Sequence, residues 1–419
     1  MKYKLLDGVN IVASTNSLFD FSVGYHDIKP FNFQNENLIL LHKYPKNLSN
    51  YTEKIKIDLC LWDYVSKEMS TIDSTFAWSW EQGSRLQWLN EHDVIYNILK
   101  DEEFKSCIYN IESKEKKILD FPIYSFSPSA KKFLYIDYSR LWFYWKSYGY
   151  YSKSDKKLKD IAEDGVFISD LNNNKELLLS IKDAMKLCGL EKIRSPIFLA
   201  HPTFNTDGDK CVSLLRFLNK SGNLISYLIC TDLSSKKNKI ISKERVSHFE
   251  WINSDKIVVW SRILNNKLQS MRNNDFLEKF IVLKLKKIIN KLHPNIKKKL
   301  LNTHYHLIDV NNDNYKILDK ENLTEDGHPQ ISSNGKYLIT DTYPNKEGFQ
   351  KLLLYSIKRD KTIELGFFKT SEYLKENKLK YDLHPRWSKS NKLISIDSSH
   401  DGSRQSYIIN IENILKKFE

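Results

Sequence analysis

Short apolar stretches alternate with polar turns along the whole chain, in a rhythm of strand, tight turn, strand, loop and strand. The clearest copies pass through a polar turn such as TDGDK or SNGK and continue into a β-branched run such as CVSLLRF or YLITDTY. A third apolar stretch follows after a spacer, for example YLICTDL or SYIINI. A unit of three to four short strands that recurs at a regular period is typical of a β-propeller blade.

Seven copies of this unit can be placed along the chain. The copies begin or lie at 29–44, 85–97, 123–141, His201, His248, His328 and His384. In a chain of 419 residues, the length available to each of the seven copies exceeds the roughly 40–50 residues of common propeller repeats. The excess leaves room for insertions. The last copy lacks a final strand, so we expect VNIVAST near the N-terminus to complete it. The sequence therefore predicts an all-β, seven-bladed propeller that forms a single domain over 1–419.

One insertion in the fifth unit, at 265–303, differs from the rest. Within it, residues 273–302 carry apolar side chains at helical spacing with lysines on the other face, and His293-Pro294 divides the segment. We expect a basic helical flap that packs on the propeller. The alternative is an amphipathic element that contacts a membrane surface or an acidic protein.

Ionisable residues recur at equivalent positions of the units and should therefore form rings around the central channel. Each of the last four units opens with a histidine, and the second unit has an arginine there; these residues are His201, His248, His328, His384 and Arg85. On the following strand, a second register is counted from the lysine of the turn. It consists of Asp137, Asp341 and Asp397 at one spacing and of Arg216 and Arg262 one residue further on.

Two interpretations of these rings are open. The groups can satisfy strand ends by hydrogen bonds between blades, or they can line a solvated binding pocket. A packed core would not collect so many of them, because each costs several kcal/mol to bury unpaired. The number of ionisable groups favours the pocket.

The chemistry of such a pocket would suit an acidic sugar. Neutral imidazoles can hold a divalent metal of the Mn, Ca or Zn class, with an amide or a carboxylate completing the shell; the expected ligands are His328, His384, His400 and Gln405. Arginines would grip a carboxylate, and a further histidine would remove the proton beside it. The expected catalytic residues are His201, His248, Arg216 and Arg262. The expected substrate contacts are Asp27, Arg85, Asp137, Arg140, Asp341, Arg386, Asp397 and Arg404.

Several strings carry a resemblance to known propellers. They include GYHDIKP, AWSWEQGSRLQWL, VSHFEW, EDGHP, DLHPRWS and HDGSRQ. The chain resembles the oligogalacturonate lyases and their TolB-like relatives, and more specifically a family of bacterial propellers often encoded near polysaccharide genes. The resemblance implies a metal held by histidines and a glutamine, with His328 and His384 in two of the positions. Tyr381 stands where the glutamine is expected, Arg386 replaces a further histidine, and Gln405 and His400 would compensate.

Composition limits the partners and the cellular location that we expect for the protein. The formal net charge of +13 favours acidic partners, but no nucleic-acid-binding module is recognisable. Five cysteines without a CxxC pair and the lack of an apolar leader lead us to expect a cytoplasmic protein. Three functions stay open: a lyase acting on uronate glycans, an enzyme or accessory protein of surface-polysaccharide (capsule or O-antigen) synthesis that binds an activated sugar, and a non-catalytic interaction propeller.

Overall fold

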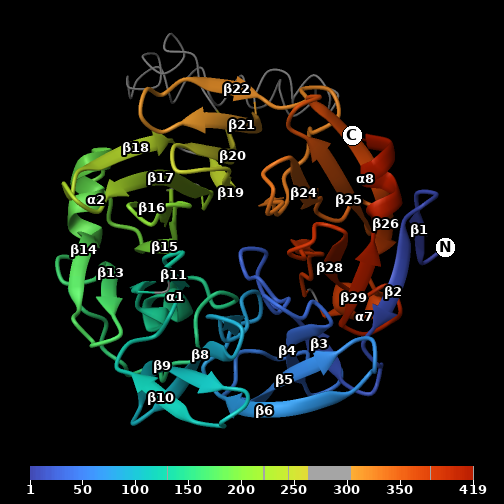
Figure 1. Ribbon diagram of the computed structural model, residues 1–419. Coiled ribbons are helices and arrows are strands. Elements are labelled where there is room, and N and C mark those ends of the chain that lie inside the picture. Colours follow the sequence, from blue (N-terminus) through green and yellow to red (C-terminus); the bar gives the residue numbers. More distant parts are fainter. Residues whose placement is uncertain (130, 220–221, 244, 263–302, 378, 419) are drawn as a thin grey trace.

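The protein is a seven-bladed β-propeller. The computed structural model describes residues 1–419 except 130, 220–221, 244, 263–302, 378 and 419. The described strands form seven antiparallel sheets arranged in a ring (Figure 1). The predicted fold class is thereby confirmed. The predicted helical flap at 265–303 lies outside the described residues, apart from Thr303, which begins a strand.

The blades follow the order of the chain from the centre of the ring outward. Blade one consists of β3 (Asp20–Ser22), β4 (Leu38–Tyr44), β5 (Ile57–Asp63) and β6 (Met69–Thr75). Blade two consists of β7 (Gln87–Trp88), β8 (Asp93–Lys100), β9 (Glu103–Asn110) and β10 (Lys116–Leu119). Blade three consists of β11 (Ser125–Phe126), β12 (Lys132–Tyr135), β13 (Gly165–Asp170) and β14 (Glu176–Ser180).

The remaining four blades include the two that receive N-terminal strands. Blade four consists of β15 (Ile197–Phe204), β16 (Lys210–Leu218), β17 (Leu224–Asp232) and β18 (Asn238–Ser242). Blade five consists of β19 (Val246–Trp251), β20 (Lys256–Arg262), β21 (Thr303–Asp309) and β22 (Tyr315–Ile317). Blade six consists of β23 (Gln330–Ile331), β24 (Tyr337–Asp341), β25 (Phe349–Ser356), β26 (Lys361–Lys369) and β1 (Tyr3–Leu5). Blade seven consists of β27 (Arg386–Trp387), β28 (Leu393–Ser398), β29 (Gln405–Asn410) and β2 (Asn10–Ser14).

Helices are few among the described residues. They are α1 (Tyr138–Tyr144), α2 (Ile181–Cys188), α7 (Glu372–Glu376) and α8 (Glu412–Phe418). In the part of the chain that the structure describes, every helix is too short or too polar to cross a membrane.

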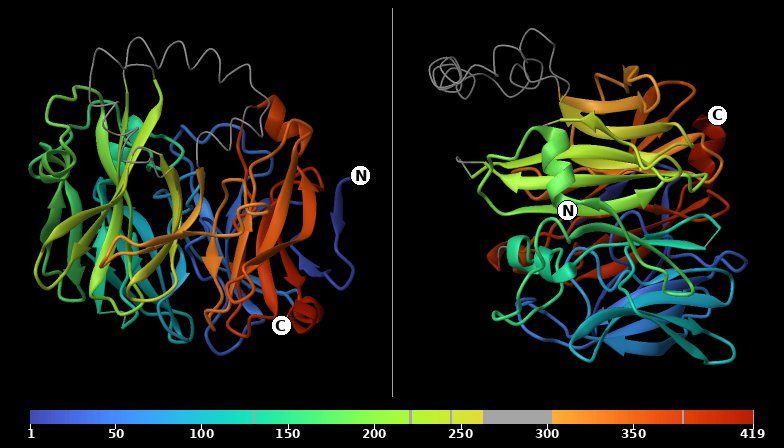
Figure 2. Two further views of the ribbon diagram at one scale, coloured as in Figure 1. Left: turned by 90° about the horizontal axis from the view of Figure 1, so that it is seen from above. Right: turned by 90° about the vertical axis from the view of Figure 1, so that its left-hand side faces the viewer.

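The two N-terminal strands join the end of the chain to its beginning. As the sequence predicts, β2 completes blade seven, where Asn10 pairs with Asn410 of β29. The sequence did not reveal that β1 adds a fifth strand to blade six, where Tyr3 pairs with Phe368 of β26. The left view in Figure 2 agrees with Figure 1 that these blue strands lie beside the red blades. Hydrogen bonds between the two ends of the chain therefore close the ring.

The core consists of apolar layers between neighbouring blades. Between blades four and five, for example, Leu214 and Leu228 pack in one cluster with Trp251 and Ile257, and all four are buried. Because a blade is covered on both faces, its middle strands are apolar in nearly every position rather than alternating. This accounts for runs such as CVSLLRF.

The first blade departs from the predicted register. The segment 29–34 was expected to form its first strand, but there it makes only an isolated bridge between Phe31 and Ile39. The strand that pairs with β4 is β3, with Asp20 opposite Tyr44. The chain between β3 and β4 turns instead toward the centre of the ring (Figure 1).

Buried His42 should make the fold sensitive to acid. Its Nε2 accepts the Ser84 N–H at 2.9 Å, and its Nδ1 lies 3.3 Å from the Ser22 carbonyl. Burial lowers the pKa of His42 from 6.5 to about 3, so the unfolded chain takes up this proton at a higher pH than the folded chain does. The stability that the neutral ring contributes is present above pH 6.5 and is lost as the pH falls, by about 2 kcal/mol at pH 5.

Urea unfolding at pH 7.5 and pH 5 checks this expectation. Between pH 7.5 and pH 5, the free energy of unfolding of the wild type should decrease by more than that of His42→Gln, because glutamine cannot take up the proton. Equal pH dependence in the two proteins would show that His42 does not titrate differently on folding.

Candidate functional site

A loop fills the centre of the ring, where it brings Tyr25, His26 and Asp27 to the inner strands. Gly24 begins it with a φ of 114°, and an added Cβ there would lie 3.0 Å from the Gln82 carbonyl oxygen, so only glycine fits. The Gln330 amide donates to the His26 carbonyl at 2.8 Å. These contacts fix the loop on blades two and six.

Five imidazoles gather around this loop. The four predicted histidines His201, His248, His328 and His384 are all buried, and His26 joins them. The Tyr25 ring stacks on His201 at 5.2 Å between centroids and contacts His384 at 5.0 Å. The centroid of the His328 ring lies 4.3 Å from that of His248 and 4.2 Å from that of His384. The repeat register therefore placed four side chains together correctly.

Backbone geometry supports the equivalence of the blades. Arg85, His201 and His384 hold the same position in three blades, and all three have left-handed φ values of 59°, 54° and 42°. Residues other than glycine adopt this conformation rarely and at a cost. Its recurrence at one position indicates a local bend that each of these blades uses to present the residue at the centre.

The Nδ1 atom of each central imidazole lies within hydrogen-bond distance of a partner. These Nδ1 contacts are His26 to the Pro329 carbonyl at 2.9 Å, His201 to Tyr124 Oη at 2.5 Å, His248 to Asp326 at 3.0 Å, His328 to Asp341 at 2.8 Å and His384 to the Gly24 carbonyl at 3.1 Å. A carbonyl or carboxylate at Nδ1 favours the proton there and leaves Nε2 with its lone pair. The Nε2 atoms of His201, His328 and His384 are buried without a hydrogen-bond partner among the described residues.

Two of these imidazoles and one carboxylate form a cluster that fits a metal ion. Ligand atoms of His328, Asp382 and His384 all lie within 4.8 Å of one another. Asp382 also accepts a hydrogen bond from the Gln350 amide at 3.1 Å. Two imidazoles held through Nδ1 and one oriented carboxylate are a donor set that divalent transition metals accept.

The pKa values of the ionisable groups in and beside the cluster are shifted in different directions. Burial, with the positive charges of His328 and Arg386, lowers the pKa of His384 well below its usual value. Although burial opposes its charge, the Asp341 carboxylate raises the pKa of His328 to about 9, so a metal ion at its Nε2 would have to displace a proton. Burial beside Asp382 raises the pKa of Glu81 to about 8. A cation at this place would relieve the crowding of the carboxyl groups.

Arg216 is a buried cation that has no anionic partner among the residues the structure describes. It is 3% exposed, its guanidinium lies 4.6 Å above the Trp145 ring, and its Nη2 donates to the Ser247 carbonyl at 3.0 Å. Within the described part of the chain its Nε has no hydrogen-bond partner, and burial lowers its pKa. An uncompensated buried charge of this kind is costly unless a ligand neutralises it. Arg262, its counterpart in blade five, is buried at the end of β20.

Most of the other predicted arginines are already neutralised by the protein itself. Arg85 makes a bidentate pair with Asp27 at 2.8 Å for both bonds, and Arg386 pairs with Asp397 at 3.0 Å. Arg140, expected to contact substrate, pairs with Asp164 instead. These contacts hold the loop and the blades together, and each of the three arginines already has a carboxylate partner in the protein.

Three further predicted residues also have structural partners. Asp137 caps α1 by accepting the Ser139 N–H at 2.8 Å. Asp341 accepts the backbone N–H groups of His328 and His384 at 2.7 and 3.0 Å, and so fixes both imidazoles. Arg404 lies over the rings of aromatic side chains, the nearest being Trp80 at 3.9 Å.

His400 and Gln405 do not join the metal cluster. The His400 ring contacts Tyr3 at 4.9 Å and Tyr407 at 4.5 Å, and Gln405 accepts from Thr15 at 2.5 Å. Both are held by N-terminal residues, since Tyr3 lies on β1 and Thr15 directly follows β2. The structure therefore replaces them with Asp382 as the third donor.

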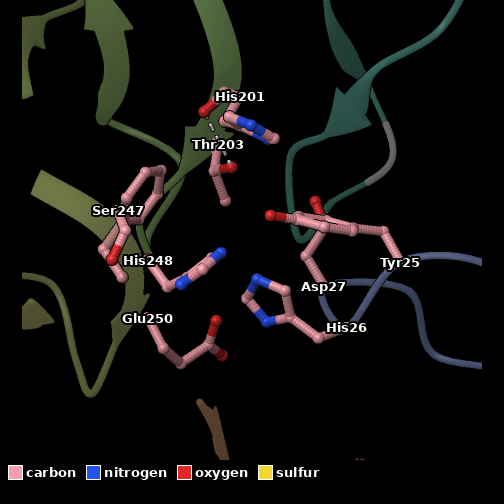
Figure 3. Close-up of a pocket in the computed structure, with 9 residues that line it drawn as sticks. Tyr25, His26, Asp27, His201, Thr203, Ser247, His248 and Glu250 are labelled. Carbon is pink, nitrogen blue, oxygen red and sulfur yellow. Dashed lines mark hydrogen bonds between the residues drawn. The ribbon is translucent and has the colours of Figure 1, made fainter. Parts of the chain in front are cut away.

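Two cavities adjoin the imidazoles. A small one of about 10 Å³, the size of one water molecule, is lined by Tyr25, His26, Asp27, His201, Thr203, Ser247, His248, Phe249 and Glu250 (Figure 3). A larger one of about 330 Å³ lies at the junction of blades four and five. Ser247 lines both, so the two cavities lie on either side of this residue.

Comparison with known proteins extends to the fold. No family model matches the chain, and no curated protein sequence matches it. Among solved structures, an oligogalacturonate lyase from Vibrio parahaemolyticus is similar over 97% of both chains, with 11% identity and a TM-score of 0.58. The chain shares its fold with an oligogalacturonate lyase.

Other similar structures are more distant. An oligogalacturonate lyase in complex with manganese covers 98% of this chain at 10% identity with a TM-score of 0.41, and TolB from Acinetobacter baumannii covers 90% at 13% identity with a TM-score of 0.38. The similarity at a TM-score of 0.58 confirms the resemblance seen in the sequence for the fold alone. At this identity the reaction has to be argued from the site itself.

Proposed function

We propose that the protein is a metal-dependent lyase that binds an acidic sugar at the centre of the ring and cleaves a uronate glycan by β-elimination. The observation that carries this proposal is Arg216, a buried guanidinium beside a cluster of oriented imidazoles that has no carboxylate partner among the described residues. A substrate carboxylate would supply the missing negative charge.

The residues that would hold the metal are His328, Asp382 and His384. A divalent ion bound there would polarise the sugar carboxylate and so acidify the neighbouring C–H bond. Asp341 fixes the two imidazoles through their backbone N–H groups and through His328 Nδ1. The protein thus supplies a preorganised donor set rather than one that has to assemble around its ligand.

His248 is placed to move the proton. The Asp326 carboxylate lies 3.0 Å from its Nδ1 and accepts from Ser247 Oγ at 2.7 Å, which orients the ring and leaves Nε2 toward the small cavity (Figure 3). In the elimination, Nε2 takes the proton from C5 of the uronate, the C5–H electron pair forms the C4–C5 double bond, and the C4–O4 bond breaks. The leaving oxygen then takes up a proton, so that charge is balanced.

Metal content and product formation test this proposal. Protein purified without chelators should carry close to one divalent ion per chain by elemental analysis, and His384→Ala and His328→Ala should lose it. The exposed side chain of His92 pairs with Glu112 at the surface, so His92→Ala is the matched control and should retain the ion.

The same proteins should then be given polygalacturonate. The wild type should release an unsaturated uronate, detected by its ultraviolet absorbance, and His248→Gln should release at least 100-fold less, in line with the contribution of a general base. Binding of the sugar without an unsaturated product would exclude the lyase. Metal-free protein that binds the sugar with full affinity would remove the metal from the proposal.

A further inference from the structure

The larger cavity between blades four and five has the character of a ligand pocket. It is about 330 Å³ in volume, which is within the roughly 300–1,000 Å³ typical of small-molecule sites. Its lining residues are Arg216, Asn223, Leu224, Ser226, Arg245, Val246, Ser247, Trp260, Thr303 and Asp326. Two guanidiniums, several hydroxyl-binding groups and one tryptophan are chemistry that suits a charged saccharide.

The pocket holds two cationic side chains at different depths. Arg216 is buried in its wall, whereas Arg245 is exposed. Within the described residues neither makes an ion pair with a carboxylate. The one acidic residue in the lining, Asp326, is engaged by Ser247 at 2.7 Å and by His248 at 3.0 Å. The pocket therefore carries positive charge that its own lining does not neutralise.

The pocket adjoins the wall of the histidine cluster. Ser247 lines both cavities, and Asp326 reaches from the larger pocket to His248 beside the smaller one. A ligand whose first acidic group lies at Arg216 can thus extend outward along the junction of the blades. The next negative group of that ligand would meet Arg245.

We infer that this pocket is a second anionic subsite, in which Arg245 recognises a further negatively charged group of the ligand held by Arg216. The inference rests on the proposed function and adds that the ligand carries two acidic groups. That second group is either the carboxylate of the next uronic acid in an oligomer or the phosphate of an activated sugar. Both would form charge-assisted hydrogen bonds with the guanidinium.

Calorimetric titrations with three probes test the inference. The probes are galacturonate, with one acidic group, digalacturonate and UDP-glucuronate, with more than one. The titrations are made in the His248→Gln background to slow turnover. Arg245→Gln should weaken binding of one of the two larger probes about tenfold, or about 1.4 kcal/mol, and leave galacturonate unchanged. Arg194, exposed with contacts only to backbone carbonyls, supplies the matched control Arg194→Gln, which should bind all probes as the parent does.

The outcomes separate the inference from the proposed function. A loss confined to digalacturonate supports a uronate oligomer, and a loss confined to UDP-glucuronate supports an activated sugar. If galacturonate binds but Arg245→Gln weakens neither larger probe, the second subsite is refuted and the proposed function stands. If the parent binds none of the probes, the proposed function fails and the inference fails with it.

Discussion

Replacing Arg386 by alanine should lower the free energy of unfolding by about 3–5 kcal/mol, because the substitution leaves a buried carboxylate without its ion-pair partner. Arg386 is fully buried, donates to the Tyr25 carbonyl at 3.0 Å and pairs with Asp397 at 3.0 Å. Without it, Asp397 keeps its charge in the core and the central loop loses its anchor on blade seven. Urea unfolding of the purified protein measures the change.

A double variant separates the lost ion pair from lost packing. Arg386→Met combined with Asp397→Asn removes both charges and keeps most of the volume, so it should recover a large part of the stability lost in Arg386→Ala. A single variant that loses less than 1 kcal/mol would show that the pair does not hold the loop. If Arg386→Ala cannot be purified, recovery of soluble protein in the double variant gives the same answer.

Arg216→Met should behave in the opposite way. Because no carboxylate of the described chain pairs with Arg216, its removal should leave the free energy of unfolding unchanged or higher, while binding of a uronate falls about 100-fold. Thermal unfolding and a calorimetric titration with galacturonate measure the two effects. Wild-type affinity, or a stability loss as large as that of Arg386→Ala, would show that Arg216 is a structural residue.

The repeat predicted the fold and the positions of the central residues well, since both follow from period. His201, His248, His328 and His384 open four equivalent inner strands, and equivalent strands of a propeller meet at its centre. The aspartate register was also real, but it located residues without revealing their partners. Asp341 and Asp397 proved to hold imidazoles, backbone and Arg386 in place.

The prediction missed three residues of the site, which are His26, Asp326 and Asp382. His26 belongs to a loop that has no counterpart in the other blades, so no alignment of repeats could place it. Asp326 and Asp382 each stand two residues before a predicted histidine, in DGH and DLH, and this recurring spacing was a signal that could have been used. His400 and Gln405 were assigned from a nearby polar string, whereas His400 contacts Tyr3 of β1 and Gln405 accepts a hydrogen bond from Thr15.

The pairing of β1 and β2 with the last blades also has a consequence for how the protein is made. Blades two to five can form as each emerges during synthesis, because their strands are close in the sequence. β2 is translated early, but it cannot pair until β29 has been translated near the end of the chain. A chain whose translation stops early would leave the N-terminal strands and the neighbouring sheet edges uncovered, and open edges of this kind recruit other chains. Truncated products of this gene should therefore aggregate where the full-length chain does not.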